Sequence, residues 1–283
     1  SESQINLNRP LNETFWLRPH HGESLMCPSP FVIWFHHRSG STHLSSLLDS
    51  HPAVASWGEF FYLGEAGATQ DVYTRSGTPN EATFLDDFYS YRWDAGGANL
   101  TETDPEPGSF RAVGFKLKYQ QAESYPGVMR YLREQPRIKV IHLVRTNLLA
   151  ALVSSAMIPR LLDRYRRPNL LSSDSSGSLE RTVRLDPDTL VHDLQELASR
   201  IDRARDAIAG FDSMEITYEN LVDHPGVTCR SLLEFLEVDP TVDLESRYVK
   251  IMPRSIRDSL NNWPEISVAI EGTPYASMLD EER

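Results

Sequence analysis

The fold is decided by the stretch FVIWFHHRSGST at residues 31–42. Its first five residues are all apolar and rich in β-formers, which is typical of a central parallel strand buried on both faces. A polar turn with Ser39-Gly40-Ser41 follows, and the pattern then predicts a helix over residues 42–50 that ends at His51-Pro52. A strand, a glycine-containing turn and a helix in this order predict an α/β protein.

Strands and helices continue to alternate along the rest of the chain. The clearest helix covers residues 188–209, where apolar residues recur at intervals of four and three. Other predicted helices cover residues 82–91, 148–157, 226–237 and most of 255–279, and further strands cover 111–119, 139–144 and 214–217. This alternation predicts a three-layer fold in which helices flank a parallel sheet. In the strand at 111–119, Lys116 and Lys118 alternate with apolar residues, which is typical of a solvated strand face.

Length and composition favour one domain over residues 1–283. We expect an N-terminal arm at 1–29 and loop-rich insertions at 64–110 and 164–188, near an acceptor site. A net charge of −12 argues against nucleic acids and polyanionic glycans as partners. We expect a cytoplasmic protein with no membrane span, because no leader pattern is recognised and no apolar run is long enough. We expect no metal either, because CxxC and HExxH spacings are absent from the sequence.

The turn after the first strand, residues 37–42, has the residues of an anion-binding loop, and we call it the anion loop. Gly40 lets the backbone approach an anion, and the N–H groups of the turn and of the first helical turn would point at it. Arg38 would add a fork of charged donors, and Ser41 and Thr42 would add hydroxyls. The alternative is a serine-capped helix without a ligand. The pattern GxxxxGK[ST] of nucleotide kinases is absent, which disfavours a magnesium-dependent kinase.

Four segments resemble the PAPS-dependent sulfotransferase family, in which PAPS is 3′-phosphoadenosine-5′-phosphosulfate. Residues 37–42 are similar to the family's Pro-Arg/Lys-Ser-Gly-Thr-Thr loop, and residues 47–59 resemble the stretch that follows it in tyrosylprotein sulfotransferases and bacterial relatives. Arg145 with Ser154, and the segment 216–236, match in the same order. The resemblance implies a P-loop NTPase-like sulfotransferase fold, PAPS as donor, its product PAP (3′-phosphoadenosine-5′-phosphate), and no metal.

The resemblance also implies which residues bind the donor. The 5′-phosphosulfate would contact the loop residues, which are His37, Arg38, Ser39, Gly40, Ser41 and Thr42. Arg145 and Ser154 would hold the 3′-phosphate. Ser154 lies nine residues after Arg145, one more than is usual in the family, so Ser155 is an alternative. Tyr218 would lie near the adenosine or in the core, and Arg257 would lie in a segment that closes over the 3′-phosphate.

Glu59 is the candidate general base, since an acceptor hydroxyl must lose its proton as it attacks sulfur. Its aromatic neighbours, which include Trp57 and Phe60, would exclude water and could raise its pKa. The alternatives are that Glu59 is an exposed loop residue, or that His37 or His43 is the base. The remaining catalytic candidates are Arg38 and Lys116, and Lys116 would contact the sulfonate or the bridging oxygen.

The expected reaction is in-line transfer of a sulfonate group from PAPS to a hydroxyl. The aromatic residues at 57–62 and 84–93 favour an apolar, lipid or carrier-bound acceptor, or a small molecule with a hydroxyl. Two other functions stay open at this point. One is a nucleotide-dependent kinase, and the other is a non-catalytic module that binds PAP or another nucleotide.

Overall fold

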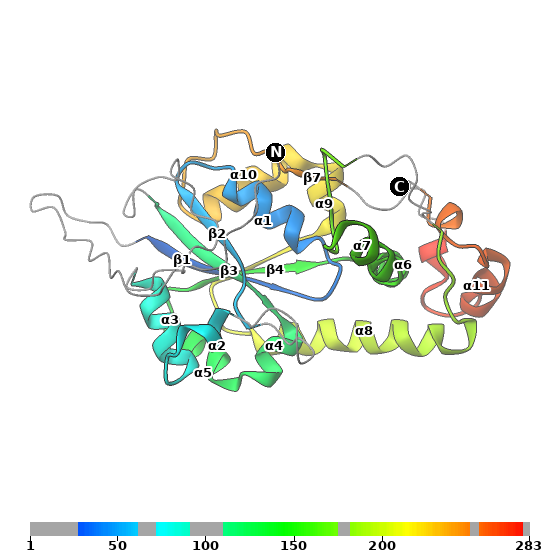
Figure 1. Cartoon of the computed structure of the whole chain (residues 1–283), viewed down its shortest axis with the longest axis horizontal. Coiled ribbons are helices and arrows are strands. Elements are labelled where there is room, and N and C mark those ends of the chain that lie inside the picture. The colour runs from blue at the N-terminus through cyan, green and yellow to red at the C-terminus, as the bar shows by residue number, and fades with distance from the viewer. Residues whose placement is uncertain (1–27, 62–71, 91–109, 175–181, 250–254, 280–283) are drawn as a thin grey trace, which may run out of the picture.

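Figure 1 shows the computed structural model, which describes residues 28–61, 72–90, 110–174, 182–249 and 255–279. Its centre is a five-stranded sheet with the order β2-β3-β1-β4-β6 and parallel pairing throughout. The strands are β1 (Ser29–Phe35), β2 (Val54–Glu59), β3 (Ala112–Lys118), β4 (Lys139–Val144) and β6 (Ser213–Thr217). The expected parallel α/β architecture is confirmed.

Helices cover both faces of this sheet (Figure 1). One layer contains α1 (Ser41–Asp49), α9 (Tyr218–Asp223) and α10 (Pro225–Phe235). The opposite layer contains α3 (Glu81–Tyr89), α4 (Tyr119–Ser124), α5 (Pro126–Glu134) and the long α8 (Pro187–Ala207). Beside these layers lie α6 (Leu148–Ala156), α7 (Ile158–Tyr165) and α11 (Trp263–Ile270), and α11 packs against α8. The short elements are α2 (Val72–Ser76), η1 (Arg257–Ser259), η2 (Ala276–Leu279), and the antiparallel pair β5 (Leu170–Leu171) and β7 (Tyr248–Val249).

The alternation of side chains along β1 explains its continuous apolar sequence. Phe31 and Ile33 join the core beneath α1 and α10, whereas Val32 and Trp34 join the core on the opposite face. A strand that is buried on both sides must be apolar at every position. Each such side chain stabilises the fold by roughly 1.5–3 kcal/mol. This central strand therefore holds the loop that follows it against a rigid sheet.

Of the two interpretations of the lysines on β3, a solvated strand face or a contact with the site, the solvated face is wrong for Lys116. Strand β3 lies between β2 and β1, and Lys116 is only 8% exposed. The alternation of charged and apolar residues is the same in a solvated strand and in a strand that turns its charges into a buried site. The strand β2 and the helices α4 and α5 were not predicted from the sequence.

The carboxyl ends of β1, β2, β3, β4 and β6 meet at one edge of the sheet, because parallel strands share a direction. The expected arm lies outside the described residues up to position 27, as do positions 64–71, 91–109 and 175–181 of the expected insertions. Within the described part of 164–188, β5 pairs with β7 and Val183 pairs with the segment at 259–261.

Candidate active site

The loop between β1 and α1 has an unusual backbone. Gly40 has φ 92°, and Arg38 has φ 62°, a region that residues with a side chain rarely adopt. A Cβ atom on Gly40 would lie 2.4 Å from Cδ2 of Tyr218. Glycine is therefore required at position 40 for two reasons, since a side chain would be strained by the backbone and would also overlap the tyrosine ring.

The same loop leads directly into the N-terminus of α1. Gly40 occupies the N-cap position, and the first turn of α1 contains no acidic residue. The first amides of a helix have no acceptor inside the helix, so they carry partial positive charge. The hydroxyl oxygen of Ser39 is fully buried and forms no hydrogen bond within the described part of the chain. The loop thus presents unused donors in a setting suited to an anion.

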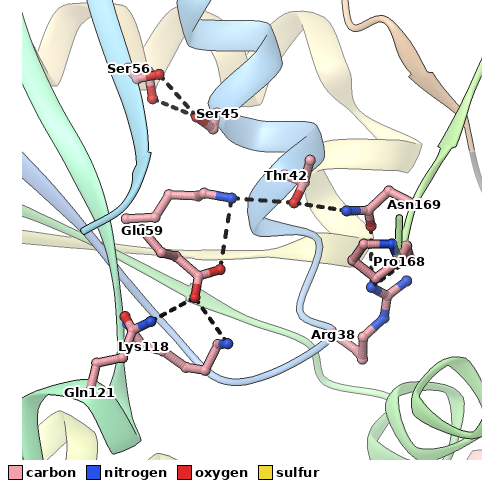
Figure 2. Close-up of polar contacts among 10 residues, drawn as sticks. Arg38, Thr42, Ser45, Ser56, Glu59, Lys118, Gln121, Pro168 and Asn169 are labelled. Carbon is pink, nitrogen blue, oxygen red and sulfur yellow. Dashed lines mark hydrogen bonds and ion pairs between the residues drawn. The ribbon is translucent and has the colours of Figure 1, made fainter. Parts of the chain in front are cut away.

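The guanidinium of Arg38 lies between α6 and the segment after α7 (Figure 2). Its Nε donates to Oγ of Ser154 at 3.0 Å. Its Nη1 donates to the carbonyl of Pro168 at 3.1 Å and to Oδ1 of Asn169 at 3.2 Å. Burial, aided by the nearby charge of Arg145, lowers the pKa of Arg38 to about 10, so it still carries its charge at neutral pH. Arg38 and Ser154, which were predicted to bind different phosphates, are in direct contact.

Arg145 follows β4 and reaches back to the same loop. Its Nη1 donates to the carbonyl of Arg38 at 3.4 Å, and its guanidinium carbon lies 4.7 Å from the centre of the Tyr218 ring. Because the ring of this tyrosine also packs on Gly40, Tyr218 joins Arg145 to the anion loop. Ser155, the alternative to Ser154, is hydrogen-bonded to Nδ1 of His37 at 3.3 Å.

Glu219 is a site residue that was not predicted. Its carboxylate accepts hydrogen bonds from the backbone N–H groups of Thr146 and Asn147, at 3.0 and 3.1 Å. Asn147 in turn caps α6, with its side chain accepting from the N–H of Ala150. The residues around Arg145 are thus fixed by a carboxylate from a different strand-to-helix connection. The signal was the Tyr-Glu pair directly after β6, in which Tyr218 was given a role and Glu219 was not.

Glu59 ends β2 and is held by three polar side chains from β3 and α4 (Figure 2). Its Oε2 lies 3.0 Å from Nζ of Lys118, and its Oε1 lies 4.0 Å from Nζ of Lys116. Gln121 donates from Nε2 to Oε2 at 2.7 Å, because its own Oε1 already accepts the N–H of Lys118. The pairing of Glu59 with Lys116 in the β2–β3 register explains this proximity. Gln121 was not predicted.

The pKa of Glu59 differs from the expectation. Burial on its own would raise this pKa, but the ammonium groups of Lys116 and Lys118 outweigh burial, and the result lies below the usual value. The expected rise is therefore wrong, because nothing in the local sequence around Glu59 indicates that two lysines face its carboxylate. Burial lowers the pKa of Lys116, and Glu59 partly offsets this effect.

Lys116 connects the carboxylate of Glu59 to the anion loop. Its Nζ donates to Oγ1 of Thr42 at 3.3 Å, and the same hydroxyl accepts a hydrogen bond from Nδ2 of Asn169 at 3.4 Å (Figure 2). On the adjacent turn of α1, Ser45 is hydrogen-bonded to the hydroxyl of Ser56 in β2 at 2.9 Å. These contacts bring Glu59, Lys116 and Thr42 into one chain of polar groups. Asn169 was not predicted, and no local pattern in the sequence could have found it.

The aromatic residues near Glu59 belong to the core. Phe60 and Phe61 are buried beneath α3, together with Phe84 and Phe88. Their rings pack against Phe115 and one another, with Phe60 stacked on Phe115 and edge-on to Phe84 and Phe88. The inference that these rings line an acceptor site is therefore wrong for these four phenylalanines, whereas Trp57 is half-buried and stays a candidate. Large aromatic side chains beside a candidate base are equally typical of a strand that enters the core.

Two predicted residues lie apart from these contacts. Arg257 is exposed in η1, and none of the described contacts joins it to the anion loop. His43 is half-buried on α1, and burial lowers its pKa. Among the described residues, no group of three or more His, Cys, Asp or Glu side chains could hold a metal ion. Within the same residues, every helix is too short or too polar to cross a bilayer.

The family is decided by a comparison with models of known families. The model described as the sulfotransferase family matches residues 30–243, a range that contains every contact of the anion loop described above. The chain belongs to the sulfotransferase family. The predicted family is confirmed, and the enzyme class that follows from it is sulfonate transfer.

This sulfotransferase is similar to a curated protein and to several solved structures. Nodulation protein H of Rhizobium meliloti (strain 1021) is 25% identical over 266 residues, which cover 91% of this chain and 97% of that protein. A sulfotransferase from Alicyclobacillus acidocaldarius is 16% identical, with a TM-score of 0.43 and coverage of 90% and 97% of the two chains. A sulfotransferase domain from the curacin biosynthetic pathway is 17% identical, with a TM-score of 0.43 and 89% of each chain covered.

Proposed function

We propose that this sulfotransferase uses PAPS as its donor and transfers the sulfonate group to a hydroxyl. The observation that carries the proposal is the contact chain Glu59–Lys116–Thr42, which joins a carboxylate to the anion loop. A general base and an anion site must be neighbours in such a reaction, because the attacking hydroxyl and the sulfonate meet.

The residues of the loop fit a bound phosphosulfate. The orphaned hydroxyl of Ser39 and the first amides of α1 are donors without acceptors in the described structure. Arg38 and Lys116 add positive charge at the same place, although the whole chain carries −12. PAPS supplies the sulfonate group, attached to a phosphate that leaves. These donors would hold that phosphate and stabilise the charge that develops on it.

The 3′-phosphate would lie at Arg145, with Ser154 or Ser155 beside it. Arg145 is buried against Tyr218, so a tyrosine ring and a guanidinium together form one wall next to the anion loop. A ring near a nucleotide site can also stack on adenine. Arg257 stays a prediction for this part of the donor.

Glu59 would accept the proton of the acceptor hydroxyl. Because its pKa lies below the usual value, the carboxylate is ionised at neutral pH and ready to accept a proton. The adjacent Lys116 would stabilise negative charge on the transferred group. A base with a lowered pKa is weak, so we propose that acceptors with acidic hydroxyls, such as phenols, react faster than aliphatic alcohols.

The experiment that tests this proposal is the variant Glu59→Gln, measured with labelled PAPS and two acceptors. Glutamine keeps the size of the side chain but cannot take up a proton at neutral pH. We expect turnover on an aliphatic alcohol to fall roughly 10²–10⁴-fold, the usual contribution of a general base. The loss should be smaller with a nitrophenol, whose hydroxyl needs little help in losing its proton.

Binding of PAP is the control, because Glu59 lies outside the anion loop and its removal should leave PAP affinity nearly unchanged. Equal losses on both acceptors would show that Glu59 orients the acceptor and is not the base. Unchanged turnover on the alcohol would transfer the role to His37 or His43.

A further inference from the structure

His36 is a buried histidine directly before the anion loop. The proposed reaction assigns no role to it. It follows directly on β1 and is 1% exposed. Its Nε2 lies 3.0 Å from the backbone nitrogen of Arg145, and its Nδ1 lies 3.0 Å from the carbonyl oxygen of His37. A backbone N–H can only donate, so Nε2 must accept. The ring is therefore neutral, with its proton on Nδ1, where it is donated to His37.

This ring links two strands beyond the point where their ladder ends. The parallel register of β1 and β4 ends with the pair Phe35 and Leu143. His36 and Arg145 lie past that pair, at the carboxyl edge of the sheet where the strands give way to loops. One imidazole thus continues the connection between the anion loop and the segment that contains Arg145.

Glu219 also holds the segment at residues 145–147 in place. The three successive amides of Arg145, Thr146 and Asn147 all donate to buried side chains, the first to His36 and the other two to Glu219. The guanidinium of Arg145 then lies on Tyr218, and Tyr218 lies on Gly40. The contacts therefore run from His36 through Arg145 and Tyr218 back to Gly40 in the anion loop.

We propose that His36 is a positioning residue that sets the spacing between the anion loop and Arg145. It thereby determines the affinity for a ligand with two anionic groups, one at each of these places. The inference rests on the donor site proposed above, and the hydrogen bond to the Arg145 amide is its essential part. A side chain at position 36 that fills the same volume but cannot accept a hydrogen bond would not replace this contact.

The test compares His36→Gln with His36→Leu. Glutamine can accept the Arg145 amide through Oε1, whereas leucine fills a similar volume without an acceptor. We expect the leucine variant to bind PAP at least tenfold more weakly by calorimetry, and the glutamine variant to stay within threefold of the wild type. The loss in the leucine variant should be smaller for AMP, which lacks the 3′-phosphate and does not need both places at once.

His142→Leu is the matched control. His142 is also 1% exposed and lies on β4, on the same face of the sheet as His36, but its Nε2 is hydrogen-bonded to Tyr119, its Nδ1 lies 2.9 Å from Glu215, and none of its described hydrogen bonds reaches Arg145 or the anion loop. This variant should lower the melting temperature and leave PAP affinity within threefold. PAP binding by His36→Leu at wild-type affinity would overturn the inference, as would an equal loss in a folded glutamine variant.

Hydrogen exchange at the Arg145 amide tests the link without any ligand. The amide should be protected in the wild type and the glutamine variant, and should exchange faster in the leucine variant. Equal protection in all three proteins would overturn the inference. If wild type fails to bind PAP while the amide loses protection in the leucine variant, the proposed donor is wrong and the link between the two segments stands.

Discussion

At the scale of single residues, the two arginines of the site, Arg38 and Arg145, support each other. Arg38 is held by Ser154 and by the segment after α7, and Arg145 is held by Tyr218 and the carbonyl of Arg38. Their side chains enter the site from different loops, yet the two residues are in contact. Each can therefore serve one phosphate while supporting the position of the other.

Arg145→Ala separates the two phosphates of the donor. We expect this variant to bind PAP much more weakly, by about 2–3 kcal/mol, because a charged contact to the 3′-phosphate is lost. Adenosine 5′-phosphosulfate has no 3′-phosphate, so its binding should change little. Calorimetry with both ligands measures the difference. Equal losses for the two ligands would show that Arg145 serves the protein structure or another part of the ligand.

The residues of the site were predictable from sequence to different degrees. The loop residues at 37–42 form a local pattern, so the strand, the glycine turn and the helix that carry the proposed anion site could be predicted from the sequence. The surroundings of Glu59 do not, because Lys118 and Gln121 reach it from β3 and α4 through the register of the sheet. For the same reason the direction of the pKa shift of Glu59 was wrong.

At the scale of elements, the strong strands and helices were predictable and the weak ones were not. Strand β1 is apolar throughout, and α8 has a clear stripe of buried residues. Strand β2 has the sequence VASWGE, contains a glycine, and changes its register between Trp57 and Glu59. It lies at the edge of the sheet, where such irregularity is tolerated. Its identity as a strand therefore depends on pairing with β3, which the sequence does not reveal.

The segment between α7 and β5 is the element that most directly covers the anion loop. It is anchored by an ion pair between Arg167 and Asp174, and Asp174 also accepts the N–H of Leu171. From this anchored position, Asn169 reaches both Arg38 and Thr42. Sequence separations of more than a hundred residues explain why these contacts could not be predicted.

Asn169→Ala tests the role of this segment. The variant loses an acceptor for Arg38 and a donor to Thr42, so both groups become less well ordered before the ligand arrives. We expect PAP to bind roughly three- to tenfold more weakly, a loss on the order of 1 kcal/mol, because the hydrogen bonds that order Arg38 and Thr42 are removed. Asn261→Ala, at an exposed position, is the control. Tighter binding of PAP by Asn169→Ala would show that Asn169 competes with the donor.

At the scale of the whole molecule, an acidic protein concentrates positive charge at one edge of its sheet. The net charge is −12, whereas Arg38, Lys116, Lys118 and Arg145 gather around the anion loop. This arrangement favours a small anionic ligand over a long polyanion.

The pH dependence of folding stability should show that His36 is neutral in the folded protein. Burial lowers its pKa from 6.5 to about 4, and this effect outweighs the hydrogen bond to the His37 carbonyl, which acts in the opposite direction. The ring also lies near Tyr119. As pH falls from 6.5 to 4, the unfolded chain takes up a proton that the native ring refuses, so this residue makes folding less favourable over that window. The cost reaches about 3 kcal/mol, at about 1.4 kcal/mol for each unit of pKa.

The variant His36→Gln has no side chain at position 36 that can take up this proton, in either the folded or the unfolded state. Urea unfolding from pH 7.5 to 4.5 should therefore show a smaller decrease in the free energy of unfolding for the variant than for the wild type. Other groups titrate alike in both proteins, so only the difference between the two curves matters. Parallel curves would contradict a neutral, buried His36.

The most direct measurement of the central claim is calorimetric titration of PAP into the wild type, Arg38→Ala and Arg200→Ala, in buffer without magnesium. Arg200 is exposed on α8, away from the site, and serves as the matched control. The wild type and Arg200→Ala should bind PAP equally well, and Arg38→Ala should bind it roughly 30- to 150-fold more weakly, because a charged hydrogen-bond donor is lost. Absence of PAP binding by the wild type, or equal binding by all three proteins, would contradict the assignment of residues 37–42 as the donor site.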